Sequence, residues 1–579
     1  MSRAVVLGNN DVAFIAWSYD EPITDCLGFA IYRQSSSQPA PTPLPAWVGF
    51  EGDSNPDWRP STTEVWPVQK FSWRDLTAAA GATYVYQIVP MIGTPGQLHP
   101  ATELALRTEP VTLTPRRSDN VLAYFNRGIL STQHLVHSLP QGPGGGPSST
   151  DLLDHIKKVG DPLRASLAGQ QIEALSSLLI RAIHDGGHCD GALYELNDPE
   201  LIGLLDTPNR ISLVLSNAED GTTPDGTNAA ARSLLHGDHI DVTDRMMPSG
   251  HIGHDKFIVY SGPDGRPASV LTGSTNWTYT GLCAQSNNAI IIDDSGLAEL
   301  YLDFYNRLKA ECPAVGKATQ SAGLRSANDH RQQFTIDGAG VTVWFSPNTV
   351  GHTKPAHNAA RPGDMAEVFD LITHAKQGIL FLLFQPGTPS VLDAIAEAQN
   401  VNDNLFIRGA ATDPKAIGNF VTQLKHRPGE PMAKVAAAAA VGDGAGKDDQ
   451  FTFWQKELLK SSPRAHAIIH DKIVVIDPLS PDCVVITGSH NLGYRASYNN
   501  DENLLIIKGH QALAEAYAVH VMDVYDHYRW RWQLAKHGQR AFTGLKRTAH
   551  AWQDAYFTGA KQDVNFWLGS RVPDAAQQQ

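Results

Sequence analysis

Two short motifs contain residue types that can act on a phosphodiester. The first comprises His254, Asp255 and Lys256 and, after an apolar segment, Gly273, Ser274, Thr275 and Asn276. The second comprises His470, Asp471 and Lys472, followed by Gly488, Ser489, His490 and Asn491. Because side chains alternate along a strand, the His and Lys of each motif share one face. Each Gly-Ser-x-Asn segment can turn tightly and offer amide and hydroxyl donors to one anionic group.

Two histidines, two lysines, two serines and two asparagines are what phosphodiester transfer needs without a metal. One imidazole attacks phosphorus and forms a covalent phosphohistidine, while the other protonates the leaving oxygen and later deprotonates the incoming water or alcohol. Lysines and amide donors stabilise the charge of the transition state. The sequence therefore predicts a phosphodiesterase with no metal site and no cofactor.

The segments that must position these motifs occur twice. Four apolar stretches of the first half recur in the same order in the second: 121–128 and 341–348, 191–196 and 378–384, 211–217 and 405–411, and 254–260 and 470–476. An amphipathic helical stretch follows the first member of each series. This pattern predicts a duplicated, two-lobed α/β fold made of 120–325 and 330–535, with equivalent loops at a shared cleft.

The N-terminal part of the chain has a different pattern. Short alternating segments at 11–20, 27–34, 83–93 and 103–113 are separated by Pro, Gly and Ser, which predicts an all-β sandwich over 1–115. Its residue positions resemble those of a fibronectin type III domain at Trp17, Leu76, Gly81, Tyr84 and Tyr86.

Residues 536–579 are predicted to form a helical C-terminal tail. The adjoining stretch 529–547 holds six Lys or Arg and no acidic residue. Such a stretch is either a solvated helix face or a peripheral contact for lipid headgroups or nucleic-acid phosphates.

Composition excludes several other classes of protein. The 579 residues include 46 Lys and Arg and 60 Asp and Glu, so the net charge of −14 gives no global attraction to nucleic acid or an anionic membrane. The five cysteines form no CxxC pair, which argues against a disulfide framework and a structural zinc site. Neither a signal-peptide pattern nor a transmembrane segment is predicted, so we expect a cytoplasmic protein.

On both motifs and the repeat, the chain from 120 to 535 resembles the phospholipase D superfamily, whose members carry paired His-x-Lys and Gly-Ser-x-Asn motifs. The resemblance implies one active site between two lobes and assigns the nucleophile and acid/base roles to the two motif histidines. The implied catalytic residues are His254, Lys256, Asn276, His470, Lys472, Asp477, Asn491 and Glu502, and the implied phosphate-binding residues are Ser274 and Ser489.

The two copies differ in their carboxylates. Ser261 stands where the second copy has the family's Asp477, and Asn287 stands where the second copy has Glu502. A carboxylate behind an imidazole raises its pKa and fixes its tautomer, which suits either an acid or a nucleophile. We therefore expect Glu502 to orient His470, its neighbour in the same repeat.

The residues leave open which histidine attacks, and the resemblance favours His254, which has no carboxylate at this spacing. For the substrate, the acidic balance favours a phospholipid headgroup, released by hydrolysis or exchanged for another alcohol. A metal-independent endonuclease acting on DNA or RNA is the alternative. A catalytically inactive binding scaffold is the third reading, because Ser261 leaves the first motif incomplete.

Overall fold

The computed structural model describes residues 2–55, 57, 59–127, 154–217, 224–312, 317–319, 321–351, 360–412, 435–437, 469–537 and 543–569. The chain forms two compact units. Unit 1 comprises Met1–Pro115, Glu515–Val519 and Lys536–Gln579, and unit 2 comprises Arg116–Ala514 and His520–Ala535. No helix among the described residues is long and apolar enough to cross a membrane.

Unit 1 contains two larger antiparallel sheets whose apolar side chains share one core, and a small two-stranded sheet of β5 (Pro45–Ala46) and β6 (Ser61–Thr62). One larger sheet has the order β1 (Arg3–Gly8), β2 (Ala13–Ser18), β7 (Ser72–Asp75). The other has the order β10 (Leu106–Arg107), β8 (Thr83–Thr94), β3 (Cys26–Ser35), β4 (Thr42–Pro43), with β9 (Gln97–Pro100) and β11 (Val111–Thr112) also paired to β8. The strands predicted at 11–20, 27–34 and 83–93 are confirmed. The segment 103–113, predicted as one strand, instead contains the end of a short helical turn (Thr102–Leu104) and two short strands, β10 and β11.

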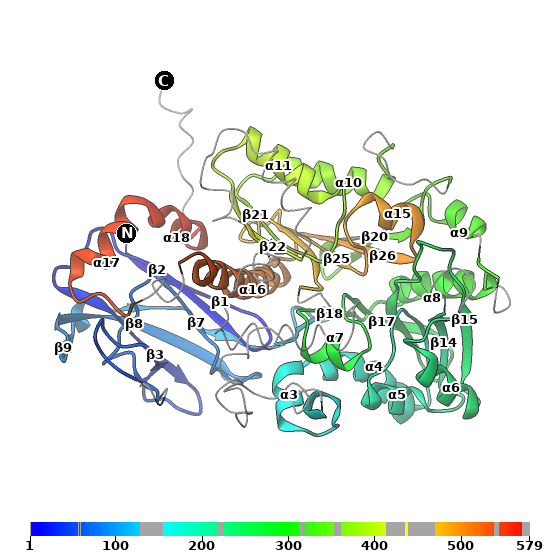
Figure 1. Cartoon of the computed structure of the whole chain (residues 1–579), viewed down its shortest axis with the longest axis horizontal. Coiled ribbons are helices and arrows are strands. Elements are labelled where there is room, and N and C mark those ends of the chain that lie inside the picture. The colour runs from blue at the N-terminus through cyan, green and yellow to red at the C-terminus, as the bar shows by residue number, and fades with distance from the viewer. Residues whose placement is uncertain are drawn as a thin grey trace. The chain divides into compact units, whose positions relative to one another are not determined.

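The C-terminal segment is part of the unit 1 core. Helices α17 (Ala549–Ala555) and α18 (Lys561–Trp567) lie against the strands of this unit (Figure 1). Trp552 and Tyr556 belong to the same buried cluster as Trp17 and Phe29, and the Trp552 indole donates a hydrogen bond to the Cys26 carbonyl (3.0 Å). Burial of these rings stabilises the segment on the sheets.

The basic stretch 529–547 lies largely outside the residues whose side chains are described. Two of its described members, Lys546 and Arg547, bind the side chain and the carbonyl of Glu51 in unit 1. Its contact with a lipid or nucleic acid therefore stays a prediction.

Unit 2 contains two mixed sheets with matching strand order. The first runs β12 (Val121–Phe125), β18 (Asn288–Ile292), β17 (Pro267–Gly273), β16 (Lys256–Ser261), β13 (His188–Leu193), β14 (Ile211–Ser216), β15 (Asp241–Arg245). The second runs β19 (Gln332–Ile336), β20 (Ala339–Ser346), β26 (Glu502–Lys508), β25 (Val484–Gly488), β24 (Lys472–Ile476), β21 (Gly378–Leu383), β22 (Phe406–Ala411), β23 (Val435–Ala437). Two strand pairs in each sheet are parallel: β13–β14 and β14–β15 in the first, and β21–β22 and β22–β23 in the second. The second sheet has one additional edge strand, β19.

Helices cover the sheets because the strands are apolar on both faces. In the first sheet, α4 (Gln171–Asp185) buries Leu175 and Leu179 in one cluster with Ile258 of β16. On the opposite face, Phe257 of the same strand contacts Tyr301 of α8 (Ser295–Ala310), with ring centroids 5.2 Å apart. In the second sheet, α10 (Gly363–Thr373) and α11 (Val391–Val401) take the covering role (Figure 1).

Candidate active site

The backbone of each motif is hydrogen-bonded to the other half of unit 2. The His254 N–H donates to the Asp501 carbonyl (2.9 Å), just before β26. The His470 N–H donates to the Ser286 carbonyl (3.0 Å), just before β18. These reciprocal bonds bring the starts of β16 and β24 together, although 216 residues separate the two histidines in the sequence.

The two predicted histidines face each other. Their ring centroids are 6.3 Å apart, and the side chains are only 2% (His254) and 3% (His470) exposed. An aromatic ring flanks each imidazole, Tyr194 at 5.0 Å from His254 and Phe384 at 4.8 Å from His470. One phosphoryl group can therefore lie between two imidazoles that come from different halves.

The Nδ1 atom of His254 lies 2.9 Å from Glu502 Oε1 and 3.1 Å from the Ser489 carbonyl oxygen. Both neighbours are acceptors, so Nδ1 carries the proton and Nε2 is left for chemistry. Our expectation that Glu502 orients His470 is therefore wrong. Because the halves are fastened crosswise, the start of β26 lies beside the first motif and not the second.

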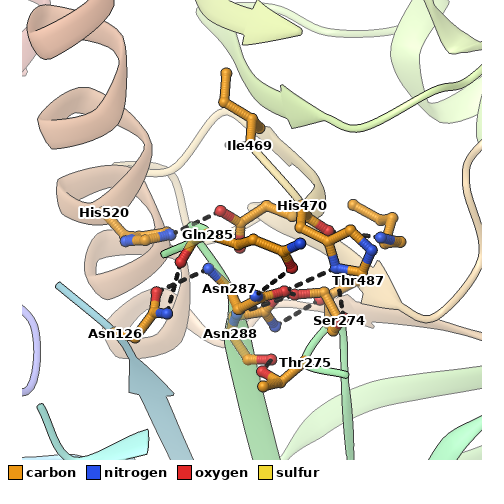
Figure 2. Close-up of polar contacts among 12 residues, drawn as sticks. Asn126, Ser274, Thr275, Gln285, Asn287, Asn288, Ile469, His470, Thr487 and His520 are labelled. Atoms are coloured by element: carbon orange, nitrogen blue, oxygen red, sulfur yellow. Dashed lines mark hydrogen bonds and ion pairs between the residues drawn. The ribbon is translucent and has the colours of Figure 1, made fainter. Parts of the chain in front are cut away.

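Asn287 occupies the equivalent position beside His470. The His470 Nδ1 atom lies 3.0 Å from both Asn287 Oδ1 and the Ser274 carbonyl oxygen (Figure 2). The Asn287 amide is itself fixed, since its Oδ1 accepts from the Ser274 hydroxyl (2.8 Å) and its Nδ2 donates to the Gly281 carbonyl (2.9 Å). One histidine thus faces a carboxylate and the other a neutral amide.

The motif serines make hydrogen bonds that their sequence positions did not predict. The Ser274 hydroxyl donates to Asn287 and accepts from the Asn288 N–H (3.0 Å), and the Ser489 hydroxyl accepts from the Asn503 N–H (3.0 Å). Both side chains are fully buried. Through these bonds and their carbonyl oxygens the serines orient the histidine rings and fix the turns, and their phosphate-binding role stays a prediction.

The two motif lysines make equivalent contacts, each with a histidine carbonyl and an aromatic ring. Lys256 Nζ donates to the carbonyl of His254 (2.7 Å) and lies 5.2 Å from the centre of the Tyr194 ring. Lys472 Nζ donates to the carbonyl of His470 (2.6 Å) and lies 5.0 Å from the centre of the Phe384 ring. Each ammonium keeps further N–H donors for an anion.

The motif asparagines lie in the same region but have different partners. Asn276 Nδ2 donates to Glu195 Oε2 (2.5 Å), which leaves one N–H of that amide for another acceptor. For Asn491 the backbone N–H donates to Glu502 Oε2 (3.1 Å). Glu195 was missed in the sequence because a single acidic residue after a strand belongs to no motif. Its place next to Tyr194, at the end of a repeated strand, is the signal that could have indicated it.

Burial and mutual repulsion set the charges of the site. Burial, followed by the nearby lysines, holds the pKa values of His254 and His470 well below their ordinary value. Burial lowers the pKa of Lys256 to about 7 and lowers that of Lys472 as well. Burial raises the pKa of Glu502. A bound anion opposes these shifts in the lysines and histidines because it stabilises their protonated forms.

Asp477, predicted as catalytic from the motif, has a structural role. It lies at the opposite end of β24 from His470, and its carboxylate accepts the backbone N–H groups of Lys376, Gln377 and Gly378 at 2.7–2.9 Å. These bonds fix the start of β21. Ser261, at the equivalent end of β16, therefore removes no group from the candidate site.

Within the described part of the chain, no group of three His, Cys, Asp or Glu side chains could hold a metal ion. The acidic groups nearest the two histidines serve as partners of ring nitrogens and amides. This set of donors fits an anionic ligand.

Comparison with known proteins gives a family match over part of the chain. Residues 368–522 match the family described as "Cardiolipin synthase, PLD-like domain". No curated protein sequence matches the chain.

Several solved structures are also similar. Polyphosphate kinase from Porphyromonas gingivalis is 12% identical, with 67% of this chain and 53% of the kinase covered and a TM-score of 0.36. This chain thus spans about half the length of that kinase. Phosphatidylserine synthase from Haemophilus influenzae Rd KW20 is 12% identical, with coverages of 68% and 93% and a TM-score of 0.37. The phospholipase D family member Nuc from Salmonella typhimurium is 20% identical, with coverages of 26% and 91% and a TM-score of 0.21.

The resemblance expected for 120–535 is thus supported over 368–522. The part of the chain that holds His470, Lys472, Asn491 and Glu502 is similar to the PLD-like domain of cardiolipin synthases.

Proposed function

We propose that the protein is a phosphodiesterase that works through a covalent phosphohistidine. The observation that carries this proposal is the pair of facing imidazoles, 6.3 Å apart, each with its Nδ1 fixed by acceptors. A nucleophile and an acid on opposite sides of one phosphoryl group are what the two-step reaction requires.

We assign the attack to His254. Its Nε2 forms a bond to phosphorus, the bond from phosphorus to the leaving oxygen breaks, and His470 Nε2 gives a proton to that oxygen. His470 then takes a proton from water or an alcohol, whose oxygen displaces His254 from phosphorus. Glu502 supports this order because a carboxylate at Nδ1 stabilises the cationic phosphohistidine, whereas Asn287 beside His470 carries no charge.

Substrate binding favours the protonated form of His470, which acid catalysis requires. In the empty site burial and the lysines disfavour protonated His470. A phosphodiester anion between the lysines offsets their repulsion and raises the pKa of His470, so the acid becomes protonated when substrate binds. Lys256, Lys472 and the free N–H of Asn276 then stabilise the transition state.

We propose a phospholipid headgroup as the substrate class, cleaved by water or exchanged for another alcohol. The match to the cardiolipin synthase PLD-like domain supports this choice, and the net charge of −14 disfavours a polynucleotide. A polynucleotide requires many cationic contacts to its phosphates. Trp277, which follows Asn276, lies in the apolar core at 1% exposure and offers no ring to a base.

The finer architecture belongs to the same proposal. The equal strand order of the two unit 2 sheets supports a duplicated, two-lobed α/β unit. The two larger sheets of unit 1 and their shared core support a fibronectin type III-like module at the N-terminus.

To test this proposal, the purified protein is incubated in EDTA with two kinds of substrate. One is vesicles of mixed phosphatidylglycerol and phosphatidylethanolamine, and the other is single- and double-stranded DNA and RNA. We expect phosphatidic acid or an exchanged lipid from the vesicles and intact nucleic acid. The His254→Ala variant, purified in parallel, identifies any contaminating activity. Cleavage of nucleic acid alone would favour the endonuclease, and loss of all activity in EDTA with recovery on adding a divalent ion would overturn the metal-independent mechanism.

A further inference from the structure

Glu195 is an acidic residue beside a site for an anion, and the two-histidine mechanism does not use it. It follows β13 by two residues, and the last residue of that strand, Leu193, pairs with Lys256 of β16. The strand register therefore places Glu195 next to the first motif. A negative charge there repels a bound phosphate, so its presence calls for another role.

Glu195 holds the turn that contains Asn276 by two hydrogen bonds. Its carboxylate accepts from Asn276 Nδ2 (2.5 Å), and its backbone carbonyl accepts from the Trp277 N–H (3.0 Å). The Asn276 side chain is buried, and its Oδ1 has no hydrogen-bond partner among the described residues. The bond to Glu195 is thus what fixes the orientation of this amide.

Glu195 also acts on both lysines through its charge. Burial lowers the pKa values of both lysines most strongly, and Glu502 is the carboxylate that opposes this most; the Glu195 carboxylate also raises both pKa values, more weakly than Glu502. Other charged groups that act on Lys256 are Glu502 and Asp255, and those that act on Lys472 are Lys256, Glu502 and Asp471. Glu195 is therefore one of the few groups that favour the protonated lysines.

The second half has no equivalent carboxylate. The strand registers align Tyr194 with Phe384 and Glu195 with Gln385, because Leu193 and Leu383 pair with Lys256 and Lys472. Gln385 is exposed. The chain thus offers an uncharged residue at the matched position as a control.

We propose that Glu195 is a positioning residue of the active site, which aims the Asn276 amide at the phosphoryl group and whose negative charge stabilises the ammonium forms of Lys256 and Lys472. This inference rests on the proposed function, since it takes these three residues to bind a phosphoryl group. Glu195 thus supports the proposed anion-binding groups, and Glu502 supports His254, the proposed nucleophile.

The experiment compares wild type, Glu195→Gln and Gln385→Ala. The glutamine variant can still accept a hydrogen bond from Asn276 but has lost the charge, so it retains the local structure. Tungstate is the probe, used at micromolar concentration so that it stays the monomeric dianion and does not condense into polytungstates. Equilibrium dialysis measures its dissociation constant from about pH 6 to about pH 9, on both sides of the Lys256 pKa. Turnover on the cleaved substrate is followed at the same pH values.

In Glu195→Gln the lysines lose their protons at lower pH than in wild type. We therefore expect tungstate to bind about tenfold more weakly than in wild type at about pH 9. At about pH 6, where more of the lysine is protonated in both proteins, the loss should shrink or reverse, because a negative charge has been removed from the site. Gln385→Ala should follow the wild-type curve throughout.

Weakening of binding by the same factor at every pH would overturn the proposal, because a merely structural role has that signature. Binding equal to wild type at every pH would overturn it as well. Failure of the proposed function is a separate outcome: wild type would then bind tungstate but cleave no diester, and the pH dependence in Glu195→Gln would still decide the role of Glu195.

Discussion

The two halves of unit 2 carry the same types of proposed catalytic residue but support them differently. In the first half, the ring of His254 faces the Glu502 carboxylate, and the Asn276 amide is tied to Glu195. In the second half, the ring of His470 faces the neutral Asn287 amide, and the residue that matches Glu195 is exposed Gln385. Both acidic side chains therefore support groups of the first motif.

In the proposed mechanism, this difference suits the separate tasks of the two histidines. A histidine that becomes positively charged in a covalent intermediate gains from a carboxylate at Nδ1. A histidine that has to alternate between acid and base gains from a neutral partner, because its pKa then responds to the bound phosphate. Since Glu502 comes from β26 of the second half and Asn287 from the first, neither half contains the complete candidate site.

The largest effect is expected from removing either imidazole. His254→Ala and His470→Ala should each lower turnover by roughly a thousandfold or more, because neither half can replace the missing nucleophile or acid. Steady-state rates with the best lipid substrate measure this. His184→Ala, an exposed histidine of α4, is the control and should match wild type. Full turnover in His470→Ala would show that the two motifs do not share one site.

The partners of the two rings should differ in importance. Glu502→Gln is expected to lower turnover by about 10–1000-fold, because the phosphohistidine loses its charged partner but keeps a hydrogen-bonding one. Asn287→Ala should cost less than about tenfold, since the Ser274 carbonyl still holds His470 Nδ1. The pH optimum should move in Glu502→Gln, which a turnover profile against pH records. Equal losses in the two variants would show that the halves act symmetrically.

Binding of an anion should be accompanied by proton uptake. Lys256 has a pKa of about 7, and Lys472, His254 and His470 also have lowered pKa values, so the empty site is partly deprotonated at neutral pH. A dianion raises these pKa values, and about one proton should enter with it at about pH 8. Calorimetry with tungstate in two buffers of different ionisation enthalpy measures the uptake. Proton release, or no exchange, would contradict the charge state assigned to the site.

The smallest effect on turnover is expected at Asp477. Asp477→Asn weakens the bonds to three backbone N–H groups and should lower the free energy of unfolding by about 1–3 kcal/mol. Asparagine tolerates the left-handed backbone at this position, where φ is 48°. Turnover should stay within about threefold of wild type, and Ser261→Asp should not increase it. A folded Asp477→Asn protein with strongly reduced turnover would return this residue to the catalytic set.

The sequence predicted the residues that face each other but not what holds them. The continuous apolar stretches after His254 and His470 were enough to predict strands that begin at the motifs, and β16 and β24 begin at the motif lysines. Glu502 was assigned to the wrong histidine because proximity in sequence says nothing about a crosswise connection between halves. Nor does the sequence show that the Ser274 and Ser489 hydroxyls accept the backbone N–H groups of Asn288 and Asn503.

The most direct test of the account is to trap the covalent intermediate. The His470→Asn variant should release its phosphoryl group slowly, because it lacks the base that activates water. After incubation with a lipid substrate and rapid quenching at alkaline pH, where phosphohistidine is stable, peptide mass spectrometry locates the adduct. We expect a phosphatidyl group on the peptide that contains His254 and none in His254→Ala. Turnover by the wild-type protein without any adduct, or an adduct on His470 in a His254→Asn variant, would contradict the assignment of His254 as the nucleophile.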